Sequence, residues 1–344
     1  MSAALEREPA PEEASIPLIE LRQVSRRFVK ALDAAAKVAN LLGAGLREEV
    51  VRAVDCVDLK VFPGEVVGLV GESGCGKSTL GRIVAGILKP SSGSVHYRGR
   101  DTSSLHGAEA RAATLAIQMI FQDPFASLNP RLRVRDIIGE APLYHGLVER
   151  DGLDRYVTDT MRRVGLDPSL RRRYPHQFSG GQRQRIGIAR ALAVKPEFIV
   201  CDEAVAALDV SIQAQVLNLF MKLREEFNLT YLFISHDLGV VRHLSDRVAI
   251  MYLGRVVEEG PAEELFDRPN HPYTVALLAE IPRLDTRRRD FAPIKGEIPS
   301  PLDPPAGCHF HPRCPHAMAR CRVEAPALKE IAPGRRSACH LNDG

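Results

Sequence analysis

The sequence has no tryptophan, no long apolar run and no large excess of charge of either sign. Its 344 residues include 46 basic and 43 acidic side chains, which leaves a net charge of +3. A membrane-spanning helix needs about 20 consecutive apolar residues, and no apolar run here approaches that length. The acidic, proline-containing segment Glu6–Glu13 is not typical of a signal peptide. We therefore expect contact with a membrane only through partner proteins.

Residues Gly71–Ser78, G-E-S-G-C-G-K-S, form the single phosphate-binding motif of the sequence. The apolar run Val66–Val70 before it predicts a buried strand, and Lys77–Leu88 predicts the following helix. Glycines let backbone N–H groups point inward, Lys77 suits the β- and γ-phosphates, and the Ser78 hydroxyl suits Mg²⁺. The alternative, a chance glycine-rich turn, seldom matches four fixed positions. The expected nucleotide contacts are Gly71, Glu72, Ser73, Gly74, Cys75, Gly76, Lys77, Ser78 and Thr79.

Two further predicted strands end in side chains that suit phosphate chemistry. Phe198–Glu203 reads F-I-V-C-D-E, so a buried strand delivers Asp202 toward a metal and Glu203 toward an attacking water. The strand Tyr231–Ser235 is followed by His236, whose imidazole is within reach of a γ-phosphate. A histidine is more often an ordinary surface or core residue, but its position at a strand end favours the functional interpretation. Gln122 follows another apolar segment and is expected to contact both Mg²⁺ and water.

The stretch F-S-G-G-Q at Phe178–Gln182 opens a predicted helix that runs to about Ala193. Backbone N–H groups and the helix dipole suit a phosphate at that end. A plain helix cap at Ser179 is the structural alternative. A cap alone does not explain why the stretch precedes an Asp-Glu strand end in a chain with a phosphate-binding loop.

Together these motifs resemble the nucleotide-binding subunit of ATP-binding cassette (ABC) transporters, from about Leu18 to the end. Gly71–Ser78 matches the Walker A motif, Gln122 the Q-loop, Asp202 and Glu203 the Walker B pair, and His236 the switch histidine. The signature motif is matched by Ser179, Gly180, Gly181 and Gln182, and the D-loop by Leu208 and Asp209. The resemblance implies that Phe28 stacks on adenine.

A finer resemblance is to the oligopeptide/dipeptide permease ATPases, in particular the second of their two paired ATPases. It is carried by the segments Phe121–Pro130, His176–Leu192, Leu208–Val216 and Asn270–Thr274. Related transporters move nickel, antimicrobial peptides or glutathione. The resemblance implies ATP and Mg²⁺ as cofactors, a second ATPase subunit in a heterodimer, two transmembrane permease subunits and an extracytoplasmic binding protein. It also implies a peripheral location at the cytoplasmic face of the inner membrane.

The expected fold is α/β, with a mostly parallel sheet, an antiparallel edge sheet and a helical subdomain. We predict a flexible tail over 1–17, the ATPase domain over 18–260 with its helical subdomain at about 123–180, and a small Cys-rich extension over 261–344. The segment 31–54 is interpreted as an insertion, partly helical. Leu18–Val24, Leu59–Val61 and Ser94–Arg98 are predicted edge strands.

ATP is expected to be held by one subunit and enclosed by the signature motif of another, so that closure drives transport. A soluble ABC-type ATPase acting on nucleic acid is the main alternative, because a cysteine cluster lies near arginines. Such proteins usually carry a long coiled coil between the two motifs, and the span from Lys77 to Gln177 leaves no room for one. The arginine runs 171–173 and 287–289 are better interpreted as solvated charge. We therefore expect no nucleic-acid partner.

Four of the seven cysteines, Cys308, Cys314, Cys321 and Cys339, lie near the C-terminal end with the spacing C-x5-C-x6-C-x17-C. Disulfides are rare in the cytosol, so a metal site is the chemical expectation. Four thiolates suit zinc or a 4Fe-4S cluster, and free thiols remain an alternative. Nearby histidines could replace a ligand. The resemblance to dipeptide permease ATPases implies a 4Fe-4S cluster, with zinc as the alternative, remote from hydrolysis.

Overall fold

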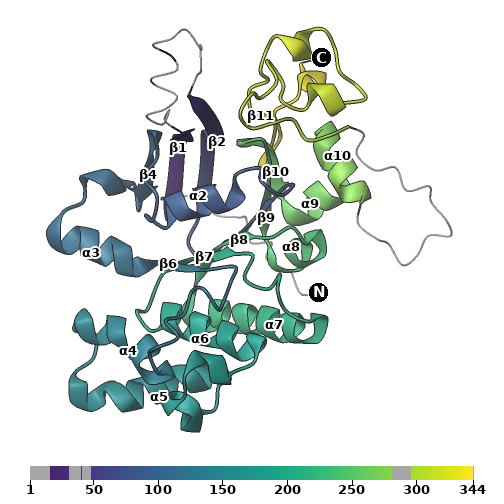
Figure 1. The fold of residues 1–344 in the computed structure, drawn as a ribbon. Helices are drawn as coiled ribbons and strands as arrows, with labels where there is room; N and C mark the ends of the chain where they lie inside the picture. Colours follow the sequence, from purple (N-terminus) through teal and green to yellow (C-terminus); the bar gives the residue numbers. More distant parts are fainter. Residues whose placement is uncertain (1–15, 31–39, 41–47, 281–295, 344) are drawn as a thin grey trace, which may run out of the picture.

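The computed structural model describes residues 16–30, 40, 48–280 and 296–343, and two sheets organise them (Figure 1). The central sheet has eight strands in the order β11-β12-β10-β9-β3-β8-β7-β6, and the second sheet has four in the order β2-β1-β4-β5. Five neighbouring strands of the central sheet, β9-β3-β8-β7-β6, run parallel, and the second sheet is antiparallel. This arrangement confirms the expected α/β fold class.

The strand and helix bounds follow the hydrophobic pattern along the chain. The strands of the central sheet are β3 (Val66–Val70), β6 (Ile117–Ile120), β7 (Phe198–Asp202), β8 (Thr230–Ile234), β9 (Arg247–Tyr252), β10 (Arg255–Pro261), β11 (Lys329–Ala332) and β12 (Arg335–Ser337). The second sheet holds β1 (Ile19–Lys30), β2 (Glu49–Val61), β4 (Ser92–Tyr97) and β5 (Arg100–Asp101). The helices are α2 (Lys77–Val84), α3 (Gly107–Ala116), α4 (Val134–Tyr144), α5 (Leu153–Arg163), α6 (Gly180–Leu192), α7 (Val210–Phe227), α8 (Leu238–Leu244), α9 (Ala262–Asp267) and α10 (Pro272–Ala279).

Helix α2 separates the two sheets, and its buried side chains belong to one core with both. Leu80, Ile83 and Val84 pack in the same cluster as residues of β1, β2, β3, β7 and β8. The helix ends at Val84, four residues earlier than the sequence predicted. The cause is Gly86, whose φ of 71° is left-handed and stops the helix. The opposite face of the central sheet is covered by α6 and α7.

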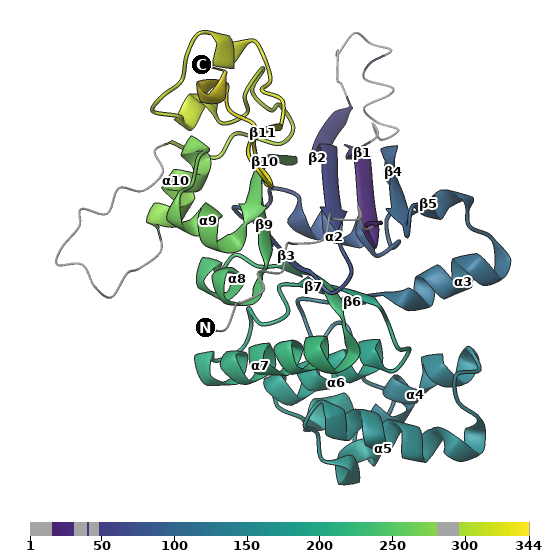
Figure 2. The same ribbon diagram turned by 180° about the vertical axis from the view of Figure 1, so that it is seen from behind.

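Helices α4 and α5 lie below the central sheet in Figures 1 and 2, in the region expected to be a helical subdomain. Their buried side chains, among them Ile138 and Val157, join the core beneath α6 and α7. The predicted domain limits themselves stay a prediction. The limit after Gly260 falls inside strand β10, which pairs on one side with β9 and on the other with β12.

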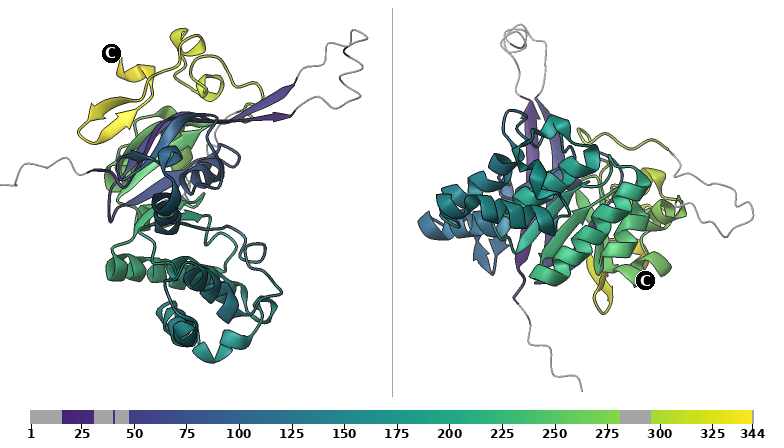
Figure 3. Two further views of the ribbon diagram at one scale, coloured as in Figure 1. Left: turned by 90° about the vertical axis from the view of Figure 1, so that its left-hand side faces the viewer. Right: turned by 90° about the horizontal axis from the view of Figure 1, so that it is seen from below.

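The segment 31–54 was predicted to be a partly helical insertion; of its described residues, Asn40 is helical and 49–54 form a strand. Residues 49–54 belong to β2, which pairs antiparallel with β1 from Lys30↔Glu49 onward. The two strands extend the edge sheet into a ribbon that projects from the body in Figure 3. Residues 49–54 form a strand because they pair with β1, and the helix-like spacing of their apolar side chains does not reveal this pairing. Most of the insertion, residues 31–39 and 41–47, lies outside the described residues, as does most of the predicted tail.

The segment after β10 packs on the body through an aromatic cluster. Phe310 is 1% exposed, and its ring lies 5.4 Å from the rings of both Tyr252 and Tyr273. Strand β12 adds hydrogen bonds by pairing with β10. The cluster gives this proline-rich segment apolar packing that the composition did not indicate.

We predict that Phe310→Ala lowers the free energy of unfolding by about 3–5 kcal/mol, the usual cost of deleting a buried aromatic ring. The exposed side chain of Val323, in the same segment, is the control: Val323→Ala should change it by less than about 0.5 kcal/mol. Denaturant unfolding of both variants measures the difference. Equal stabilities for the two variants would show that the cluster contributes nothing.

Candidate functional site

The phosphate-binding loop leaves β3 at Val70 and curls around the ammonium group of Lys77 before α2 begins. Lys77 Nζ donates to the backbone oxygens of Gly71, at 2.7 Å, and Glu72, at 3.0 Å, and the side chain is almost fully buried. Gly76 has a φ of 108°, and a Cβ there would lie 2.0 Å from the Ala53 oxygen. Only glycine fits this position. The loop therefore surrounds a buried positive charge at Lys77.

Ser78 and Asp202 meet across the gap between α2 and β7. Ser78 Oγ donates to Asp202 Oδ1 at 2.7 Å. Asp202 is 2% exposed, and burial raises the pKa of its carboxyl group, although the Ser78 hydrogen bond acts in the opposite direction. A hydroxyl and a carboxylate from two rigid elements form a donor pair suited to a hard cation such as Mg²⁺.

Glu203 is the point where three strand ends converge. Its Oε2 accepts a 2.6 Å hydrogen bond from Gln122 Nε2, and its Oε1 lies 3.5 Å from His236 Nδ1. Strands β6, β7 and β8 precede these three residues and are parallel neighbours, so their carboxyl ends meet at one edge. The Glu203 φ of 47° is left-handed, a conformation that non-glycine residues adopt at a cost of about 1–3 kcal/mol and mostly at functional sites.

A cavity of about 240 Å³ joins these two groups of residues. Its wall comes from the phosphate-binding loop, from the Q-loop and Walker B positions, and from β2: Val51, Ala53, Ser73, Gly74, Gly76, Lys77, Ser78, Thr79, Gln122, Glu203 and Pro301. Pro301, from the segment after β10, was not predicted. Phe28 is not among the described residues that line the cavity; it lies opposite Val51 in the β1–β2 ribbon, with the Arg26 guanidinium 4.8 Å from its ring centre.

The signature residues lie at the start of α6 and are not part of that cavity. Ser179 Oγ accepts from the Gln182 N–H at 3.3 Å, and Gln182 Oε1 accepts from the Ser179 N–H at 3.0 Å, which completes a capping box. A Cβ on Gly181 would approach Ile212 to 2.4 Å. This close packing brings the signature next to the start of α7, where Asp209 is the N-cap residue. The structure thus gathers the predicted residues into two separate groups.

The four C-terminal cysteines line one small cavity of about 10 Å³, together with His271, His311, His316 and His340. Burial raises the pKa of the Cys308 thiol to about 11, and it also raises the pKa of Cys314 and Cys339. No group of three or more His, Cys, Asp or Glu side chains in the described ranges is arranged to hold a metal ion. A cavity of this size admits about one water molecule, so the thiols must move apart to admit a four-iron cluster.

Sequence reasoning missed two residues that contact the phosphate-binding loop from behind. Arg313 makes two hydrogen bonds to the Glu72 carboxylate, at 2.8 and 3.0 Å, and the Tyr273 hydroxyl accepts from the Glu72 N–H at 2.9 Å. Both lie in segments noted only for their resemblance to a family. Partners so distant in sequence leave no local signal.

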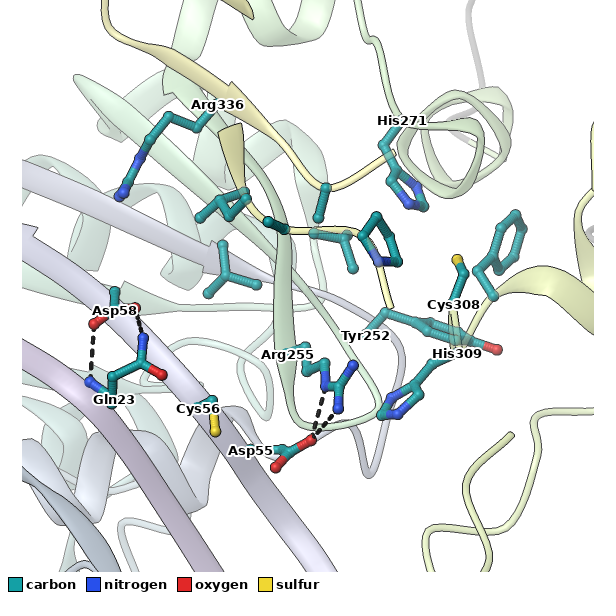
Figure 4. A pocket seen from close by; sticks show the side chains of 17 residues that line it. Gln23, Asp55, Cys56, Asp58, Tyr252, Arg255, His271, Cys308, His309 and Arg336 are labelled. Atoms are coloured by element: carbon teal, nitrogen blue, oxygen red, sulfur yellow. Dashed lines mark hydrogen bonds and ion pairs between the residues drawn. The ribbon is translucent and has the colours of Figure 1, made fainter. Parts of the chain in front are cut away.

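A larger cavity of about 370 Å³ lies between β2, the β9–β10 hairpin and the C-terminal segment (Figure 4). Its visible polar contacts are internal: Arg255 pairs with Asp55 at 2.6 Å, and Gln23 bonds Asp58. His309 points toward the hairpin, where its Nδ1 lies 3.2 Å from the Leu253 oxygen. Because these polar groups already have partners, the cavity offers few free groups to recognise a ligand.

Comparisons with known proteins agree with this site. Residues 54–206 match the family model "ABC transporter", and residues 257–321 match "Oligopeptide/dipeptide transporter, C-terminal region". The oligopeptide transport ATP-binding protein AppF of Bacillus subtilis is 54% identical over 295 residues, which cover 85% of this chain and 90% of AppF. OppF of Salmonella typhimurium, also named an oligopeptide transport ATP-binding protein, is 50% identical, with 81% of this chain and 84% of OppF covered.

The di/tripeptide transport ATP-binding protein DppF of Pseudomonas aeruginosa is 48% identical, with 84% of this chain and 90% of DppF covered. Among solved structures, the ATP-binding cassette MJ0796, described as a dimer bound to ADP and Pi, aligns with a TM-score of 0.60 and 27% identity over 71% of this chain and 98% of that one. The chain belongs to the ABC transporter family of ATP-binding proteins. Of the helices described, none is long and apolar enough to cross a bilayer.

Proposed function

We propose that this chain binds and hydrolyses ATP to drive the import of oligopeptides or dipeptides through a membrane complex. The observation that carries the proposal is one cavity lined by Lys77, Ser78, Gln122 and Glu203. The peptide cargo is supported by the printed names of AppF, OppF and DppF and by the match over 257–321. These relatives do not favour the soluble nucleic-acid ATPase that the sequence left as an alternative.

We assign the roles of the cavity residues from their positions. Lys77 and the loop N–H groups bind the β- and γ-phosphates, and Thr79 adds a further contact. Ser78, Asp202 and Gln122 would hold Mg²⁺, which would neutralise negative charge on the phosphates. Glu203 accepts a proton from the attacking water as the bond from that oxygen to the γ-phosphorus forms and the bond to the bridging oxygen of ADP breaks. His236 orients the γ-phosphate.

The second group of residues is proposed to act on the nucleotide of a partner ATPase. Ser179, Gly180, Gly181, Gln182 and Asp209 lie together at the starts of α6 and α7, outside the cavity that holds Lys77. Head-to-tail pairing would place these helix N-termini against a γ-phosphate, where their N–H groups are stabilising. Phe28 stays our proposal for the adenine contact, because its strand partner Val51 lines the cavity.

Further partners follow from the family. We propose a heterodimer with a second ATPase, two permease subunits and an extracytoplasmic binding protein, with the chain at the cytoplasmic face of the membrane. Phe125, in the Q-loop segment, supports a permease contact because its ring is 63% exposed and the Arg183 guanidinium lies only 3.6 Å from its centre. Aromatic side chains are enriched at protein interfaces.

The four C-terminal cysteines are proposed to hold a 4Fe-4S cluster, with a structural or redox-sensing role. The support is chemical: four thiols from distant positions line one cavity, and thiolates are the usual ligands of such clusters. Raised thiol pKa values mean that binding must displace protons, which makes loading weaker at low pH. Zinc stays the alternative, because a single ion needs less movement of the thiols.

We predict that Glu203→Gln keeps ATP binding but lowers hydrolysis by the assembled complex about 100-fold or more, the usual contribution of a positioned base. Phosphate release and ATP affinity measure the two properties. Gln keeps the shape and the Gln122 contact, so a folding defect is not expected. Turnover within a few-fold of the unchanged complex would contradict the role of Glu203.

We predict that Ser179→Arg abolishes hydrolysis while leaving ATP affinity nearly unchanged, because Ser179 acts on the partner's nucleotide. Lys77→Ala should instead weaken ATP binding itself. The same serine-to-arginine change at the exposed Ser103 is the matched control and should leave both properties unchanged. Normal hydrolysis by the Ser179 variant with its partners present would rule out the head-to-tail dimer.

For the cysteines we predict a brown protein when it is purified without oxygen, with broad absorbance near roughly 400 nm and about four iron atoms per chain. Replacing the four cysteines by serine should abolish colour and iron, whereas Cys56→Ser, at an exposed cysteine outside the group, should not. A colourless protein with one zinc ion per chain would show that the site binds zinc and no cluster. A quadruple variant that folds fully without metal would contradict both the cluster and the zinc site.

A further inference from the structure

The C-terminal segment reaches the phosphate-binding loop through a buried ion pair. The two terminal guanidinium nitrogens of Arg313 donate to the two carboxylate oxygens of Glu72, at 2.8 and 3.0 Å. The side chains are 4% and 18% exposed, respectively. Bidentate pairs of this kind are the strongest and most directional of protein hydrogen bonds. They fix a position as well as supplying attraction.

The backbone of Glu72 is held from the same side. Its N–H donates to the hydroxyl of Tyr273 at 2.9 Å, and Tyr273 is fully buried in α10. The Tyr273 ring packs 4.6 Å from Tyr252, whose hydroxyl lies 3.4 Å from Arg313. Arg313 therefore holds the side chain of Glu72, and the buried Tyr273 holds its main-chain N–H.

Glu72 is also one of the two residues whose carbonyl holds Lys77. Lys77 Nζ donates to the Glu72 oxygen at 3.0 Å and to the Gly71 oxygen at 2.7 Å. The N–H of Glu72 is fixed by Tyr273, its carboxylate by Arg313, and its carbonyl contacts the lysine. Any shift of Glu72 therefore changes the position of the Lys77 ammonium group.

The same segment supplies part of the cavity wall on the opposite side of the loop. Pro301 lines the cavity with Val51 and Ala53, and its carbonyl accepts a 3.4 Å hydrogen bond from the Arg52 N–H. The chain after β10 thus contacts the site three times, through Pro301 at the wall and through Tyr273 and Arg313 behind the loop.

We propose that the segment after β10 is a working part of the ATP site, in which Arg313 positions the phosphate-binding loop by holding Glu72. The inference rests on the proposed function, because it concerns how that loop binds ATP. Arg313 is a positioning residue: it acts through Glu72 and does not touch the nucleotide. The competing explanation is that the Arg313–Glu72 ion pair anchors the segment without affecting the conformation of the loop.

The test compares MgATP affinity of the full chain with hydrolysis by the assembled complex. Arg313→Ala should raise the Kd for MgATP about tenfold or more, while kcat at saturating MgATP changes by less than about twofold, because the bound state is rebuilt by the nucleotide. Arg313→Lys should lie between the two, because lysine keeps the charge but loses the bidentate fork. Glu72→Ala should weaken binding to a similar extent.

A double variant identifies the route. If Arg313 acts through Glu72, the Arg313→Ala and Glu72→Ala double variant binds MgATP no more weakly than either single variant. Arg336→Ala is the matched control, because it removes another arginine of the segment, whose Nε donates to Glu259 at 2.6 Å away from the loop. It should lower the melting temperature without changing the Kd for MgATP.

Three results would overturn the proposal. One is an unchanged Kd in Arg313→Ala, and the second is a fully additive loss in the double variant. The third is an Arg336→Ala variant that loses as much stability as Arg313→Ala and also loses as much affinity for MgATP. If Arg313→Ala fails to fold, Glu72→Gln tests the same contact from the loop side, and an unchanged Kd there overturns it too. If the unaltered chain does not bind MgATP at all, the proposed function itself fails.

Discussion

The site depends on one constraint: the parallel pairing of β3, β8, β7 and β6 brings four strand ends to a single edge of the sheet. Each strand is followed at once by a polar group, so the phosphate-binding loop, Gln122, Glu203 and His236 converge without any of them being close in sequence. Because both faces of these strands are covered, their register is fixed by burial. A slip of one residue would turn Asp202 away from Ser78.

This constraint explains why much of the site could be predicted from sequence. Short apolar runs that end in Asp202, Glu203 or His236 indicate buried strands. Because the carboxyl ends of parallel strands lie at one edge of a sheet, the side chains that follow them lie together. The Ser78–Asp202 contact follows the same logic. Helix α2 was predicted too long because Gly86 lies outside the motif and its left-handed φ was not recognised as a stop.

Features that rest on long-range pairing could not be predicted. Residues 49–54 carry helix-compatible spacing, yet they form a strand because β1 lies beside them. The C-terminal segment looked poor in apolar residues, and its packing depends on a few aromatic rings contributed by Tyr252, Tyr273 and Phe310 from three different elements. No local pattern indicates that Arg313 lies against Glu72, since the contact exists only once β10 has brought the segment back to the sheet.

Two consecutive glutamates in β10 show why the C-terminal segment and the ATPase body are inseparable. Glu258 is 1% exposed and accepts from the Asn270 and His271 N–H groups at 2.8 and 2.9 Å, whereas Glu259 accepts from Arg336. Neighbouring side chains of a strand point to opposite faces, so the two carboxylates need partners on both sides.

Those partners come from the two residues before α10 and from β12, both beyond the strand. Without them β10 would be an open sheet edge with unpaired backbone N–H and C=O groups, and its two carboxylates would lose their hydrogen-bond partners. Displacing the segment therefore destabilises the sheet whose other strands end at the ATP site. The cysteine cavity lies on the same segment, and Arg313, between Cys308 and Cys314 in the sequence, joins this segment to the phosphate-binding loop through Glu72.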